Sequence, residues 1–149
     1  MVFDNQPESI DYPSLEWSEP PPLNHDTIWA ILNETISDIQ VNQILWHHLG
    51  YKYDLATQTW DTTQVAPTWL ETYPTPPDFI ASRPATVKLT RSIPPEHKQL
   101  LKQQLNFKGY KLGEFGPRQT RRASAASWLL AQLAIDNQLL IIDSKPREN

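Results

Sequence analysis

The chain has 149 residues, which fits one domain of ordinary size. It contains no cysteine, and this excludes disulfides, thiolate metal sites, iron–sulfur clusters and a cysteine nucleophile. The hydrophobic share of 39% is low for a globular chain, but six Trp, five Tyr and four Phe supply large apolar surfaces for a core.

The net charge of −4 conceals a division along the chain. Residues 1–80 hold 12 acidic residues and one basic residue, whereas residues 81–149 hold 12 basic and five acidic residues. This asymmetry predicts either an anionic partner for the second half or two halves that attract each other.

The two ends differ in composition from the middle of the chain. Residues 1–24 contain five prolines, five acidic residues and no basic residue, which predicts an extended or disordered acidic arm. This arm lacks the basic and apolar regions of a secretory signal. We expect one globular domain over 25–135 and a C-terminal tail over 136–149. The apolar stretch at 128–142 is too short and too polar to span a bilayer, so no membrane partner is expected.

Two helices are predicted near the start of the globular domain. Apolar residues at helical spacing indicate a helix over 27–36, with Asp26 as its N-cap. A second apolar face indicates a helix that starts at Ser37 or Asp38 and ends at Gly50, which suits a left-handed C-terminal position.

The next segment alternates aromatic and polar residues, which predicts a β-hairpin over 51–60. Tyr51 and Tyr53 would lie on one strand and Trp60 on the other. Five prolines then indicate a connecting loop over 61–85, with one helical turn near 68–72 that lies against the body.

The second half is predicted to return to helices after one short strand. Alternation favours a strand over 86–90, and the Pro94–Pro95 pair favours the start of a third helix. Residues 108–115 read as a second strand or a tight loop, and a fourth helix is expected from 117 or 120 to 134. The fold class is therefore α+β: a helix-dominated single domain of about four helices, with an aromatic β-hairpin and one or two short strands.

Basic residues concentrate in residues 81–135, which hold ten Lys or Arg against two Glu. Three arginines open the fourth predicted helix, where positive charge opposes the helix dipole, so an anion or a carboxylate is expected there. The candidate partner-binding residues are Lys108, Tyr110, Lys111, Arg118, Arg121 and Arg122.

Three interpretations of this basic segment stay open. It can bind an acidic protein surface or the chain's own acidic arm, it can bind RNA or DNA with Tyr110 stacking on a base, or it can be a solvated face. The acidic first half would repel a nucleic acid, which favours the protein partner.

The sequence offers no recognisable catalytic or metal-binding motif. His47 and His48 are adjacent on one helix and point in different directions, so they are poorly placed to chelate one metal ion. There is no HExxH, no phosphate loop and no GxSxG. We therefore expect no metal, no cofactor and no enzymatic activity; an enzyme built from scattered residues is the remaining alternative.

Several segments together resemble a small uncharacterised domain family of cyanobacteria and plastids, over about residues 25–133. They lie at residues 27–33, 41–54, 84–93, 107–110 and 117–130. The resemblance implies a cyanobacterial cytoplasm or a plastid stroma and an assembly role in photosynthetic organisms, and it supplies no catalytic residue. The functional hypothesis is a non-enzymatic interaction or assembly factor, with nucleic-acid binding as the alternative.

Overall fold

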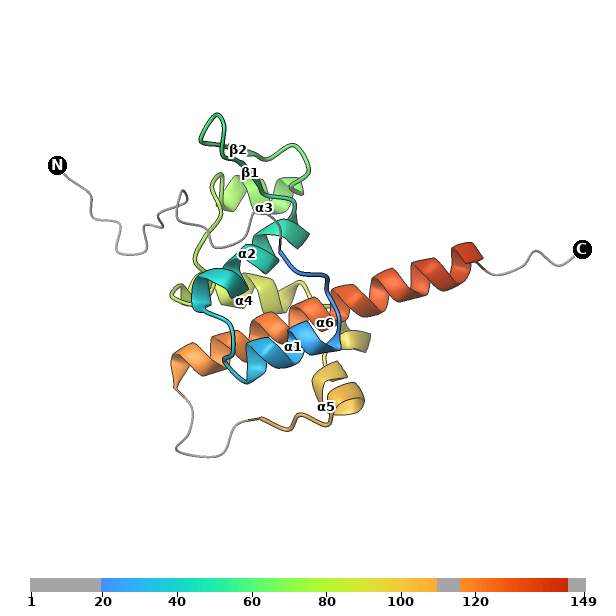
Figure 1. Cartoon of the computed structure of the whole chain (residues 1–149). Helices are drawn as coiled ribbons and strands as arrows, with labels where there is room; N and C mark the ends of the chain where they lie inside the picture. The colour runs from blue at the N-terminus through green and yellow to red at the C-terminus, as the bar shows by residue number, and fades with distance from the viewer. Residues whose placement is uncertain (1–19, 110–115, 145–149) are drawn as a thin grey trace, which may run out of the picture.

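The computed structural model describes residues 20–109 and 116–144, with side chains as far as residue 137 (Figure 1). Within these residues the chain forms six α-helices, one 3-10 turn and one antiparallel hairpin, which confirms a helix-dominated α+β domain. In chain order the elements are α1 (His25–Leu32), α2 (Asp38–Leu49), β1 (Lys52–Asp54), β2 (Thr59–Asp61), α3 (Pro67–Thr72), α4 (Arg83–Arg91), η2 (Pro95–His97), α5 (Leu100–Leu105) and α6 (Pro117–Ser144).

Side-chain caps fix where the first two helices begin. The Asn24 side chain accepts a hydrogen bond from the Thr27 amide at 2.9 Å, so Asn24 caps α1, and Asp26, the predicted cap, lies in the first turn. Ser37 and Gln40 exchange hydrogen bonds as a capping box at the start of α2, so Ser37 is the cap of the two residues that the sequence left open, Ser37 and Asp38.

The predicted aromatic hairpin is confirmed, although Tyr51, which the sequence placed on the first strand, lies just before β1. Tyr53 lies opposite Trp60 in the β1–β2 register, and their ring centroids are 4.9 Å apart. The Trp60 ring also meets Trp46 of α2 edge-on at 5.6 Å and Tyr51 at 6.4 Å. These contacts attach the hairpin to the C-terminal end of α2.

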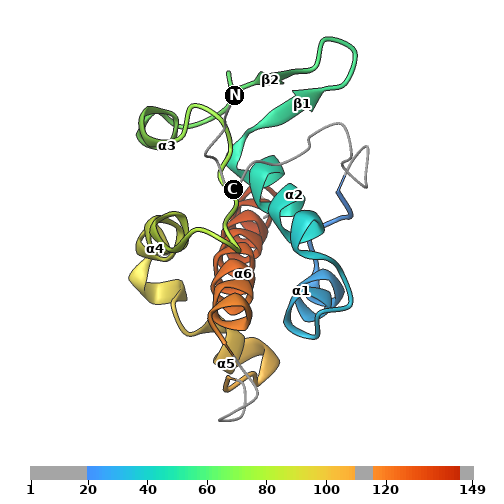
Figure 2. The same cartoon turned by 90° about the vertical axis from the view of Figure 1, so that its left-hand side faces the viewer.

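Helix α6 is the element around which the other helices pack. It contacts α1, α2, α4 and α5, and Figure 2 shows α4 on one side of it and α1 with α2 on the other. Its buried residues repeat at helical spacing, as expected for a helix that faces a core. Among its described side chains they are Arg122, Ala125, Ala126, Trp128, Leu129, Leu130 and Ala131.

The strand predicted over 86–90 was wrong, because these residues belong to helix α4. Ser82 caps this helix through the Ala85 amide at 3.3 Å, and Pro84 occupies the first turn, where a proline is tolerated. The alternation of Val87 and Leu89 is too short to identify a strand. At helical spacing, the neighbouring residues place one face in the core and one toward solvent.

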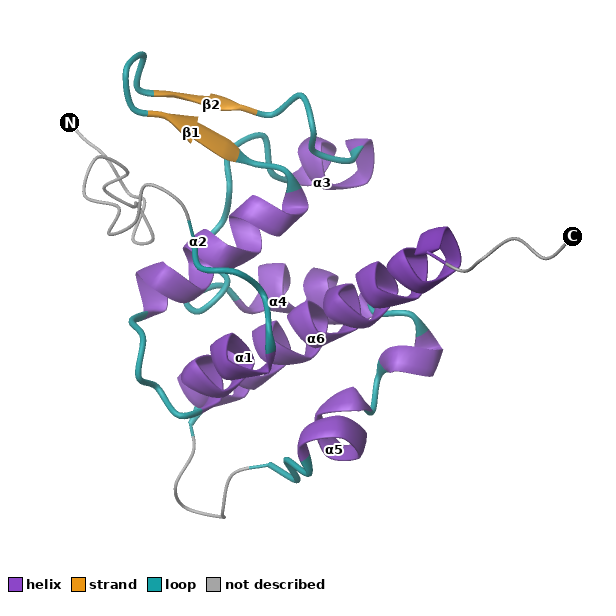
Figure 3. Ribbon diagram, turned by 45° about the vertical axis from the view of Figure 1, so that its right-hand side comes forward, coloured by secondary structure: helices purple, strands orange, loops and turns teal. Residues whose placement is uncertain are grey.

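The predicted third and fourth helices also differ in extent. Pro95 opens the 3-10 turn η2, and the α-helix α5 begins later, at Leu100. Helix α6 continues through Ser144 instead of ending near 134, and its last turns project beyond the body (Figure 3). No Gly or Pro interrupts residues 118–144, so nothing in that stretch ends the helix.

Parts of the predicted arm, loop and tail lie outside the described residues, namely 1–19, 110–115 and 145–149. No helix in the described ranges combines the length and the apolar character that crossing a membrane requires.

Candidate interaction surface

Arg122 is the centre of the arginine cluster at the start of α6, and it is fully buried. Its Nε donates to the Ile31 carbonyl at 3.0 Å, and its Nη2 donates to the Ile36 carbonyl at 2.8 Å. Its Nη1 donates to Asp38 Oδ1 at 2.7 Å. One guanidinium therefore ties α6 to the end of α1, the α1–α2 connection and the first residue of α2.

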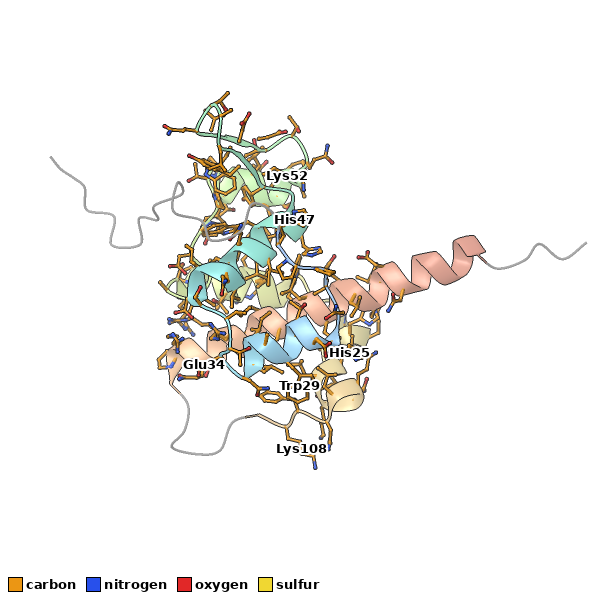
Figure 4. All side chains as sticks on the ribbon, viewed as in Figure 1. His25, Trp29, Glu34, His47, Lys52 and Lys108 are labelled. Carbon is orange, nitrogen blue, oxygen red and sulfur yellow. The ribbon has the colours of Figure 1, made fainter. Side chains whose placement is uncertain are left out.

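Arg118, one turn earlier, completes the same network. Its Nη1 contacts Glu34 Oε1 at 2.6 Å, and its Nε contacts Asp38 Oδ2 at 2.7 Å. The hydrogen bond from Arg118 lowers the pKa of Glu34 below its ordinary value, although partial burial acts in the opposite direction. Figure 4 shows Glu34 next to the end of α6 at which these arginines lie. The carboxylates expected from the helix dipole at the start of α6 thus come from this chain.

Arg121 points to a different part of the chain. Its Nη1 donates to the Ile80 carbonyl at 3.1 Å, in the segment that leads into α4. The three arginines that the sequence selected for partner binding are thus all engaged in contacts within the domain.

The remaining predicted residues are placed separately or are not described. Lys108 is exposed and lies at the bottom of the view in Figure 4, apart from Glu34. It follows Phe107, whose ring meets Trp29 at 6.3 Å. Tyr110 and Lys111 lie outside the described residues.

A separate basic groove, with a volume of about 590 Å³, lies between α3 and α4. Figure 2 shows these two helices one above the other on the same side of the molecule. We call it the α4 groove. Three cations and three apolar residues line it: Arg83, Lys88, Arg91, Trp69, Pro84 and Val87.

The helical spacing of α4 explains why these cations share a surface. Arg83, Val87 and Arg91 follow one another at intervals of four residues, so they form a stripe along one side of the helix. The buried residues Ala85 and Leu89 lie on the opposite side, in the core. The core contact of α4 therefore fixes the basic stripe toward the groove.

Trp69 of α3 forms an apolar wall of the groove. Its ring packs on Phe79 at 5.8 Å and on Tyr73 at 6.2 Å, and only 7% of the residue is exposed. Lys88 Nζ lies 5.1 Å from the ring centroid, a cation–π distance. The tryptophan is therefore held rigidly, with a cation over its face.

No opposing charge balances the α4 groove within the described part of the chain. No acidic residue lines it, and no described carboxylate forms an ion pair with Arg83, Lys88 or Arg91. Arg83 and Arg91 are exposed. Such a surface can bind a ligand that brings its own negative charge.

A second hollow, of about 500 Å³, lies where α2 meets the hairpin and includes His47, His48, Lys52 and Asp61. The two imidazole rings meet edge to face at 5.2 Å. Burial lowers the pKa of His48, and His47 and Lys52 lower it further, whereas Asp136 raises it. Among the residues with described side chains, no three His, Asp or Glu gather as metal ligands do.

The sequence placed Arg83, Lys88 and Arg91 in the basic segment, but these residues were not among the candidate partner-binding residues. The predicted strand over 86–90 hid their common face, because alternate residues of a strand point to opposite sides. The four-residue spacing of Arg83, Val87 and Arg91 was the signal that could have identified the stripe.

Comparisons with known proteins give a family and a fold relative. A family model described as a domain of unknown function, DUF1823, matches residues 22–134. A protein structure solved by solution NMR is similar to this chain, with 51% sequence identity and a TM-score of 0.71. The match covers 78% of this chain and 98% of that one. None of the curated proteins matches the chain.

Proposed function

The chain belongs to the DUF1823 family, a domain of unknown function, and from this premise we propose its function. The chain is a non-enzymatic protein-interaction or assembly factor that uses its basic segment to bind an acidic protein surface. Within that segment, the α4 groove is the place where exposed cations flank an apolar surface. The predicted cluster at the start of α6 serves instead to hold the domain together.

The observation that carries this proposal is the contrast between two sets of cations. Arg118 and Arg122 contact Glu34 and Asp38 within the domain. The exposed Arg83 and Arg91 have no described carboxylate partner. Charge complementarity across an interface steers association and selects the partner, and this groove offers it to an anion.

The low exposure of Trp69, the aromatic residue of the groove, favours an acidic protein over RNA or DNA as the partner. Single-stranded nucleic acids are bound by stacking bases on aromatic faces. Trp69 is 7% exposed, and Lys88 lies over its face, so it offers little stacking surface.

The proposed setting follows from the resemblance of the segments named above to a family of cyanobacteria and plastids. In this proposal the protein acts in the cyanobacterial cytoplasm or the plastid stroma, as an assembly factor of photosynthetic organisms. It needs no metal and no cofactor there.

The proposal is tested by measuring the affinity of fluorescein-labelled deca-glutamate for the full chain by polarisation at low salt. The double variant Arg83→Glu/Arg91→Glu is expected to weaken binding at least about tenfold, because it places like charges opposite the ligand. The control Lys102→Glu/Lys108→Glu makes the same charge change at exposed positions outside the groove and is expected to weaken binding less than about threefold.

Two results would overturn the proposal. One is equal loss of affinity in the two double variants, which would indicate a response to net charge alone. The other is tighter binding, by about tenfold or more, of a single-stranded oligonucleotide of matched charge that is lost in Arg83→Glu/Arg91→Glu. That result would assign the groove to nucleic acid.

A further inference from the structure

We infer that the α4 groove recognises an extended acidic peptide with two carboxylates four residues apart and an apolar side chain midway between them. This inference rests on the proposed function and specifies the partner that the groove fits. It follows from the spacing of the cations along α4 and from the apolar residues between them.

The spacing of Arg83 and Arg91 sets the distance between the two carboxylates. Eight residues separate them, and at 1.5 Å per residue they lie about 12 Å apart along the helix axis. An extended peptide advances about 3.3 Å per residue. Side chains of an extended chain alternate between two faces, so two carboxylates four residues apart share a face and reach both arginines at once.

The segment between the two arginines favours an apolar side chain. Val87 lies midway along the stripe and is half-buried, and the exposed Pro84 lines the same groove. A Leu or Ile side chain placed there removes apolar area from water on both partners. A polar residue at the same place gains nothing from these neighbours.

The cations have different roles in this arrangement. Arg83 and Arg91 are exposed and end in planar guanidinium groups, which suit bidentate contact with carboxylates. Lys88 lies over the Trp69 ring and contributes positive charge at the centre of the groove. A ligand that presents only anionic groups, such as a phosphate backbone, would contact the three cations but not the apolar residues between them.

The rigid wall of the groove supports selectivity. Trp69 packs against Phe79 and Tyr73, and its position is fixed by the core before a ligand arrives. Helix α4 is held by its contact with α6. A preformed site loses little conformational entropy on binding, so differences in ligand spacing appear in the affinity.

The inference is tested with three nonapeptides and the full chain, by titration calorimetry at low salt. The spaced peptide is Gly-Ser-Glu-Ser-Leu-Ser-Glu-Ser-Gly, and the contiguous peptide has the same composition in the order Gly-Ser-Glu-Glu-Ser-Ser-Leu-Ser-Gly. The third peptide replaces Leu of the spaced peptide by Ser. The spaced peptide is expected to bind at least about threefold more tightly than the contiguous one and about tenfold more tightly than the Ser peptide.

A matched protein variant separates the apolar contribution from the charges. Val87→Ala keeps all three cations and is expected to reduce the preference for Leu over Ser by at least about threefold. Arg83→Glu/Arg91→Glu is expected to abolish the preference for the spaced peptide over the contiguous one.

The outcomes distinguish this inference from the proposed function. Equal affinity for the spaced and contiguous peptides, with both weakened in Arg83→Glu/Arg91→Glu, would overturn the inference and leave the proposed function standing. Peptide binding that is unchanged in that variant would overturn both. A synthetic peptide of residues 1–19 that bound about tenfold more tightly than the spaced peptide would overturn the inference in favour of an occupant from the chain itself.

Discussion

At the scale of single residues, Arg122 carries a charge that is fully buried and paired within the domain. Replacement by Met would leave the Asp38 carboxylate without this partner and two backbone carbonyls, of Ile31 and Ile36, without their donor. Asp38 is partly exposed and keeps Arg118 as a partner, so the main cost is that of a buried acceptor without its donor, about 1–3 kcal/mol. We therefore expect Arg122→Met to lower the free energy of unfolding by about that amount in urea denaturation.

The exposed Lys102→Met is the matched control for Arg122→Met and is expected to change the free energy of unfolding by less than about 0.5 kcal/mol. A loss below about 1 kcal/mol in Arg122→Met would show that the buried network contributes little to stability.

Glu34 gives the domain a dependence on acid pH. Its native pKa is lowered by the Arg118 hydrogen bond, so the unfolded state, with a glutamate pKa of about 4.3, binds the proton more strongly. The stabilisation is complete above the unfolded pKa and is lost as the pH falls through the lower native pKa. Glu34→Gln should therefore reduce stability near neutral pH and flatten the decline of stability below about pH 5.

Urea unfolding from neutral to acid pH checks this expectation, with Glu96→Gln as the control at an exposed position. An unchanged pH profile in Glu34→Gln would contradict the assigned role of Glu34.

At the scale of elements, the junction between α2 and the loop after the hairpin depends on Gly50. This residue has φ of +105°, and an added Cβ would lie 2.5 Å from the Gln64 carbonyl oxygen. Gly109 has a similar φ of +110° but no atom within 4 Å of such a Cβ. Both Gly→Ala changes carry the left-handed cost of about 1–2 kcal/mol. Gly50→Ala is expected to lose distinctly more, because the backbone of Gln64 must also move.

Thermal unfolding of Gly50→Ala and Gly109→Ala measures this difference directly. Equal losses of melting temperature in the two variants would show that the loop containing Gln64 accommodates the added methyl group without loss of stability.

The helices and the hairpin also show which structural features can be predicted from local sequence patterns. Ser37, Gly50 and the Tyr53–Trp60 pair were predicted correctly, because caps, left-handed glycines and cross-strand aromatic pairs are set by neighbouring residues. The strand over 86–90 was wrong, since a short alternation also fits one face of a helix that packs on α6. Packing against the distant helix α6 determined the structure of residues 86–90, and a local sequence pattern does not reveal such packing.

At the scale of the whole molecule, the charge division along the sequence becomes a contact between its two halves. Glu34 and Asp38 come from the acidic half, and Arg118 and Arg122 come from the basic half. The sequence predicted that the halves could attract each other. It could not select the pair, because the α1–α2 break that brings these carboxylates together at Arg118 is a tertiary feature. The α4 groove was not predicted for the same reason, because the position of α3 beside α4 is also a tertiary feature.

The α4 groove also predicts how binding responds to salt. Its cations are at least partly exposed, so their attraction to an acidic ligand is screened at higher ionic strength. The affinity for deca-glutamate is expected to fall several-fold between about 20 mM and about 200 mM NaCl. The apolar preference for Leu over Ser in the nonapeptides is expected to persist, because burial of apolar area does not depend on screening. Loss of this preference together with the affinity would contradict an apolar contact.

The most direct measurement of where an acidic ligand binds is a titration of the isotope-labelled full chain with the spaced peptide, followed by amide and indole chemical shifts in NMR spectra. We expect the largest changes at Thr68, at the Trp69 indole and along residues 83–92, with small changes at residues 118–122. The largest changes at residues 108–122, with residues 83–92 unaffected, would contradict the assignment of the accessible basic surface to the α4 groove.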